Sequence, residues 1–112
     1  MEQHLKPWGK EVWLLNDEEA DHCQKHLHIN KGSGISWHFH KVKSEIFLVL
    51  EGKVLIEYGE TPTFRERTCK VLEPGEFFYV PTGLIHTVAA LEDSIIFEES
   101  TFHRDEDSIR VA

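Results

Sequence analysis

Three histidines and one glutamate are spaced along this chain in a way that could bind a metal ion. The candidate ligands are His38, His40, Glu45 and His86. His38 and His40 stand two residues apart in a strand-like segment, and residues at this spacing project from the same face of a strand. Glu45 follows after a short connection, so an antiparallel return of the chain brings its carboxylate beside the two imidazoles. His86 follows a Pro-Thr-Gly turn that can aim its ring at the same point.

This ligand set indicates a divalent transition metal. Three imidazoles and one carboxylate, without a thiolate, suit Mn, Fe(II), Ni, Co or Zn. An octahedral ion that binds these four side chains keeps two positions for water or substrate, as Lewis-acid or oxygen chemistry requires. We therefore expect a small-molecule substrate.

The segments around these residues have the pattern of β-strands. Apolar and polar residues alternate with a period of two over residues 22–29 and 35–40. Short apolar runs follow, separated by turns rich in Gly, Pro and Asn. We expect eight or nine short strands, one helical turn at residues 16–20, and an all-β fold. The natural choice is a single-domain jelly-roll β-barrel over residues 1–112.

Length and composition are consistent with this fold. The 112 residues suffice for one hydrophobic core, and 40% of them are hydrophobic. The net charge is −8, of which −7 falls in residues 71–112. So acidic a chain lacks the basic face that nucleic-acid binding needs. No apolar run is long enough to span a membrane, and the start does not resemble a signal peptide. We expect a cytoplasmic protein in which Cys23 and Cys69 are reduced thiols.

Two segments that contain these candidate ligands resemble the two-part motif of the cupin superfamily. The first part runs from Gly32 through His38, His40 and Glu45 to Gly52, and the second runs over residues 75–86. The resemblance implies a cupin barrel whose metal ligands are His38, His40, Glu45 and His86. The Asn that usually closes the second motif is Ala90 here, which leaves the ligand set intact.

The flanking residues resemble the cupin region of bacterial mannose-6-phosphate isomerases. The similarity lies in residues 6–12, in Lys25 before residues 27–29, and in the tail over residues 99–110. It implies carbohydrate metabolism, with a metal-dependent isomerase or epimerase that acts on an anionic sugar, either a phosphorylated or a nucleotide-linked one. Candidate phosphate-binding residues are Lys25, Lys41, Lys43 and Arg104. Candidate bases are His26, His28, His103 and Tyr79, none of which is assigned as the catalytic residue.

Two other classes of function use the same ligands. One is an Fe(II)-dependent dioxygenase or lyase. Some cupin lyases have a Tyr two positions after the Glu ligand, and this chain has Phe47 there. The other is a non-enzymatic module that binds a sugar or a metal.

The strand pattern also predicts a homodimer. If His38 and His40 face the barrel interior, then Ile35, Trp37 and Phe39 face outward, and a second copy would bury these side chains. The alternative is that the chain's own residues 8–15 cover them.

Overall fold

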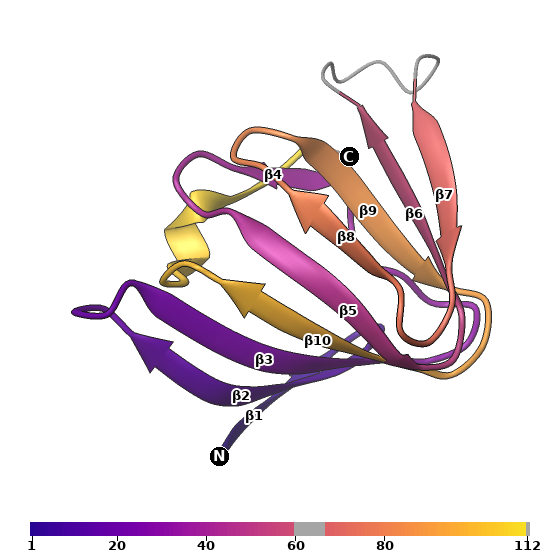
Figure 1. The fold of residues 1–112 in the computed structure, drawn as a ribbon, viewed down its shortest axis with the longest axis horizontal. Helices are drawn as coiled ribbons and strands as arrows, with labels where there is room; N and C mark the ends of the chain where they lie inside the picture. The colour runs from indigo at the N-terminus through magenta and orange to yellow at the C-terminus, as the bar shows by residue number, and fades with distance from the viewer. Residues whose placement is uncertain (60–66, 112) are drawn as a thin grey trace.

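The computed structural model describes residues 1–59 and 67–111, which form two antiparallel β-sheets that face each other (Figure 1). The six-stranded sheet has the order β1 (Glu2–Lys6), β2 (Gly9–Asp17), β3 (His22–Ile29), β10 (Ser94–Ser100), β5 (Glu45–Glu51) and β8 (Phe77–Val80). The five-stranded sheet has the order β11 (Ser108–Arg110), β4 (His38–His40), β9 (Ile85–Ala90), β6 (Val54–Gly59) and β7 (Thr68–Leu72). The expected all-β jelly roll is confirmed.

The inner faces of the two sheets follow the period-two pattern of the sequence. On β3, Cys23, Lys25, Leu27 and Ile29 are buried, and the side chains between them are half-buried on the other face. The apolar members of the inner faces form one core. It consists of Trp8, Leu27, Ile29, Phe47, Val49, Val54, Ile56, Leu72, Val80, Val88, Ala90 and Ile96. The polar inward residues, Lys25 among them, lie outside this apolar cluster.

The chain ends and one turn differ from the expectation. Strands β1 and β11 extend the two sheets at their edges, which raises the number of strands in the described part of the chain to 11. The helical turn expected at residues 16–20 is wrong, because Asn16 and Asp17 end β2 and a non-helical turn follows. The Asn16 side chain accepts a hydrogen bond from the His103 amide (2.9 Å) and donates one to its carbonyl (3.1 Å).

The segment before β4 is only partly a strand. Gly34 forms an isolated bridge with Ala89, and Ile35 turns inward to pack against the core instead of facing outward. Trp37 and Phe39 are half-buried. The N-terminal segment does not pair with this sheet, because β2 pairs with β3 in the other one. The homodimer therefore stays a prediction.

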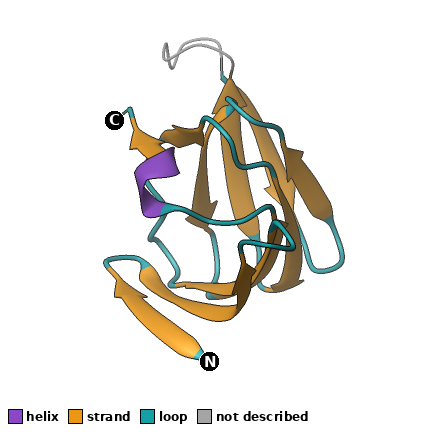
Figure 2. Cartoon of the chain, turned by 90° about the vertical axis from the view of Figure 1, so that its left-hand side faces the viewer, coloured by secondary structure: helices purple, strands orange, loops and turns teal. Residues whose placement is uncertain are grey.

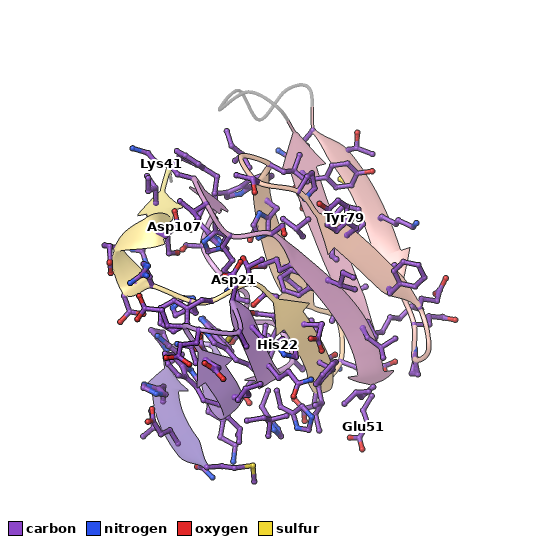
Figure 3. The ribbon with its side chains drawn as sticks, turned by 60° about the vertical axis from the view of Figure 1, so that its left-hand side comes forward. Asp21, His22, Lys41, Glu51, Tyr79 and Asp107 are labelled. Carbon is purple, nitrogen blue, oxygen red and sulfur yellow. The ribbon has the colours of Figure 1, made fainter. Side chains whose placement is uncertain are left out.

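A carboxylate from the C-terminal segment fixes the connection between β4 and β5. The short 3-10 helix η2 (Asp105–Asp107) lies at this end of the molecule (Figure 2). The Asp107 carboxylate accepts hydrogen bonds from the amides of Lys41, Val42 and Lys43, at 2.9 to 3.3 Å. Figure 3 shows Lys41 and Asp107 on neighbouring segments. This contact sets the path of the chain between His40 and Glu45.

Gly52, in the short connection from β5 of one sheet to β6 of the other, is a sensitive point of the fold. Its φ is +87°, and a Cβ there would lie 2.8 Å from Ser94 Cα and closer still to Ser94 Oγ and the Asp93 carbonyl. Gly75 has a similar φ of +89° but nothing within 4 Å of the added Cβ. We predict that Gly75→Ala lowers the free energy of unfolding by about 1 kcal/mol. Gly52→Ala should lower it by about 3 kcal/mol or more, because overpacking adds to the backbone strain. Urea unfolding of both variants measures the difference, and equal losses would contradict the packing argument.

Candidate metal centre

The strand register brings the three histidines together. His38 on β4 is paired with His86 on β9, and His40 lies two residues further along β4 on the same face. The ring centroids are 4.3 Å apart for His38 and His86, and 5.0 Å apart for His38 and His40. One nitrogen of each ring lies within 4.8 Å of the others, and all three side chains are buried. A group of this kind could bind a metal ion.

Backbone carbonyls orient two of these rings. His38 Nδ1 lies 2.7 Å from the Ser36 carbonyl, and His86 Nδ1 lies 2.9 Å from the Leu84 carbonyl. A carbonyl only accepts hydrogen bonds, so each Nδ1 carries the proton and each Nε2 keeps a free lone pair. Hydrogen bonds of this type fix the tautomer of metal-binding histidines.

The surroundings of His38 favour its neutral imidazole. Burial, reinforced by the neighbouring His86, lowers the pKa of His38 to about 4. His86 Nε2 is buried and has no hydrogen-bond partner among the described residues. Leaving such an atom without a partner costs free energy, which coordination to a cation would recover. The residues present therefore fit a divalent metal.

Glu45 lies beside the three histidines. Its carboxylate oxygens are 3.3 Å from His40 Nε2 and 3.7 Å from His86 Nε2. Burial alone would raise the pKa of Glu45, but Lys43, 3.4 Å away, and the two imidazoles hold it well below the usual range. The carboxylate is therefore ionised and adjacent to the cluster. Its role as the fourth ligand stays a prediction.

The cluster adjoins a cavity of about 490 Å³. His38, His40 and Glu45 line it, whereas His86 is fully buried behind them. The opposite wall comes from β2, β3 and β10, and the residues before β2 and after β10 complete it. A small molecule in this cavity would approach the histidines directly.

Two buried lysines line the same cavity, each beside a carboxylate. Lys43 Nζ lies 2.7 Å from Glu98 Oε2, and Lys25 Nζ lies 3.4 Å from Glu11 Oε1. Lys25 also sits over the Trp13 ring, 4.3 Å from its centroid. Although burial disfavours a charged ammonium, Glu98 and Glu45 raise the pKa of Lys43. The ammonium of Lys43 is therefore charged.

The structure separates the other candidate residues into two groups. Lys25, Lys43 and His103 line the cavity. Lys41 is exposed, and Arg104 is held on the surface by Glu18 at 2.7 Å. His26 and His28 lie on the outer face of β3, and Tyr79 is 54% exposed on β8 (Figure 3). Of the four candidate bases, only His103 reaches the cavity.

Sequence reasoning missed four charged residues of the cavity wall, which are Lys6, Glu11, Glu98 and Arg110. Glu98 follows Ile96 at the period-two spacing of β10, so its inward orientation could have been read from the strand pattern. Glu11 and Arg110 reach the cavity through strand pairings that no local pattern specifies.

The comparisons with known proteins agree with this geometry. A family model described as the cupin domain matches residues 25–98, which include all four candidate ligands. The uncharacterized protein YdbB of Bacillus subtilis (strain 168) is 33% identical over 69 residues. The match covers 62% of this chain and 54% of YdbB, so the chain spans about half the length of this curated relative.

Several solved structures share the fold. KdgF from Halomonas sp. has a TM-score of 0.78 at 21% identity, over 95% of this chain and 92% of KdgF. The capsular polysaccharide assembling protein CapF from Staphylococcus aureus has a TM-score of 0.82 at 17% identity, over 96% of this chain and 33% of CapF. Oxalate decarboxylase from Bacillus subtilis has a TM-score of 0.81 at 16% identity, over 97% of this chain and 29% of that protein. At these identities the similarity shows the fold alone. Within the described residues, no helix is long and apolar enough to cross a membrane.

We predict that the protein binds about one equivalent of transition metal, which elemental analysis measures. His86→Ala should lose most of this metal, because the buried Nε2 is removed. His28→Ala is the matched control, since that ring lies on the outer face of β3. Equal metal content in wild type and in folded His86→Ala would show that the histidine cluster is not the metal site.

Proposed function

Because the chain belongs to the cupin family, we propose that it is a metal-dependent isomerase or epimerase for a phosphorylated or nucleotide-linked sugar. His38, His40, Glu45 and His86 would bind the metal. The observation that carries this proposal is the buried His86 Nε2, which has no hydrogen-bond partner among the described residues and belongs to the cluster beside the cavity. The similarity of the flanking segments to mannose-6-phosphate isomerases supports the choice of substrate.

A metal bound by these residues would polarise the carbonyl and hydroxyl oxygens at C1 and C2 of a sugar. The remaining requirement for aldose–ketose isomerisation is a group that moves a proton between these carbons. This group must reach the same cavity and be in its deprotonated form at neutral pH before it accepts the proton.

His103 meets both conditions. An ammonium only donates, so Lys43 Nζ donates to His103 Nδ1 at 3.2 Å, and His103 Nε2 then donates to Asp105 at 2.8 Å. Burial and the nearby Lys43 and Lys25 lower the pKa of His103, which keeps the ring neutral. Asp105 thus leaves Nδ1 as the unprotonated nitrogen of His103, and this nitrogen would accept a proton from a substrate that displaces the Lys43 ammonium from it. Lys43 also contacts Glu45, so Lys43 links His103 to the candidate metal ligand Glu45.

A metal-dependent lyase is the second candidate function. The same donors suit Fe(II), and oxalate decarboxylase has this fold. The residue two positions after Glu45 argues against this function, because Phe47 lines the cavity with a ring that has no hydroxyl to donate a proton.

We predict that the metal-loaded protein converts mannose-6-phosphate to fructose-6-phosphate, which a coupled assay measures. His103→Gln should lower kcat by about 100-fold or more because the base is lost. The variant should keep its metal content, since His103 is not a proposed ligand. His26→Gln is the matched control on the outer face of β3.

Oxygen uptake with Fe(II), or decarboxylation of a small acid, together with no isomerisation of any sugar phosphate, would replace this proposal with the oxygenase or lyase. Thermal shifts with sugar phosphates in the absence of any turnover would indicate a binding module.

A further inference from the structure

We propose that Arg110 binds the anionic group of the ligand, a phosphate monoester or a carboxylate, directly beside the cluster of His38, His40 and His86. This inference rests on the proposed function, because it identifies where the charged end of an anionic sugar would lie. It is supported by the position of Arg110 in the sheet, by the balance of charges in the cavity wall and by the absence of a partner for its guanidinium among the described residues.

The first observation is the pairing of β11 with β4. Arg110 is the register partner of His38, and Ser108 is the register partner of His40. Side chains of directly opposed residues lie on the same face of a sheet, with their Cβ atoms about 5 Å apart. Arg110 therefore projects from the face that presents His38, and it lines the same cavity.

The second observation is the charge of the cavity wall. Among the described residues, the charged side chains of the wall are the cations Lys6, Lys25, Lys43 and Arg110 and the carboxylates Glu11, Glu45 and Glu98. The three lysines all lie near these carboxylates. Lys43 contacts Glu98 and Glu45, while Lys25 and Lys6 lie 3.4 and 4.0 Å from the oxygens of Glu11. The four cations exceed the three carboxylates by one, and Arg110 is the cation that is not paired with any of them. The chain as a whole has a net charge of −8.

The third observation is that the Arg110 side chain forms no hydrogen bond or ion pair with any residue in the described part of the chain. Arg104, six residues earlier, is instead neutralised by Glu18 on the surface. A guanidinium presents a planar fork of donors that matches the two oxygens of a phosphate or carboxylate. At the wall of a cavity, beside a site for a divalent cation, this fork is suited to an anion.

The test is calorimetric titration at constant ionic strength, with inorganic phosphate, acetate and neutral mannose as probes. Each is titrated into wild type, Arg110→Gln, Arg110→Lys and Arg104→Gln. We expect phosphate or acetate to bind at least about ten-fold more tightly to wild type than to Arg110→Gln, because the variant loses a charge-assisted pair. Arg110→Lys should recover part of this affinity, and Arg104→Gln should match wild type. Whichever anion binds more tightly identifies the anionic group.

Equal anion affinity in wild type and Arg110→Gln would overturn the inference, as would an equal loss in Arg104→Gln or the absence of anion binding to wild type. The titrations are repeated after metal removal with EDTA. Dependence on Arg110 in both forms supports the anion site even if no sugar is turned over. Failure of the proposed function would instead appear as missing metal or missing isomerisation, which these titrations do not measure. Thermal unfolding of Arg110→Gln should match wild type, since the Arg110 side chain has no hydrogen-bond or ion-pair partner in the described part of the chain.

Discussion

The pairing of β4 with β9 is the constraint on which the candidate site depends. It places His38 opposite His86, and the two-residue repeat of β4 adds His40 on the same face. Carbonyls of Ser36 and Leu84 then fix the tautomers of two rings, so their free lone pairs face the cluster. A shift of the register by one residue would turn these side chains to the other face of the sheet, and the three imidazoles would no longer lie together. The geometry of the site is thus a property of the sheet.

Asp107 couples this strand to the rest of the site. Its carboxylate accepts hydrogen bonds from the backbone amides between His40 and Glu45, and Asp107 belongs to the segment that leads into β11. One side chain therefore sets both the path of the chain to Glu45 and the start of the strand that positions Arg110. The buried pair of Lys43 and Glu98 completes the support of Glu45 by placing an ammonium next to its carboxylate. Removing one member of such a pair would leave an uncompensated buried charge.

The sequence predicts the part of this structure that local patterns encode. Period-two alternation indicates the inner face of β3 and the shared face of His38 and His40, because side-chain direction depends only on the neighbouring residues. Long-range pairing leaves no such signal. The contact of β11 with β4 joins residues about 70 positions apart in the chain, so Arg110 could not be identified as a cavity residue. The predicted outward orientation of Ile35 is wrong because this residue precedes the strand, where alternation no longer governs side-chain direction. Lys41 and Lys43 show the same limit, since one is exposed and the other buried although both flank the ligands.

The burial of His86 behind the other three side chains has a stereochemical consequence. His38, His40 and Glu45 line the cavity, but His86 is 0% exposed and closes the far side of the cluster. Among the described residues, His86 closes its side of the cluster, so a molecule that enters the cavity meets the side of His38, His40 and Glu45. His103 is fixed on the wall by Lys43 and Asp105, so a planar carbon held beside the cluster by further contacts would turn one of its two faces to the imidazole. A proton transferred there would then reach that face alone, and the product would be a single stereoisomer.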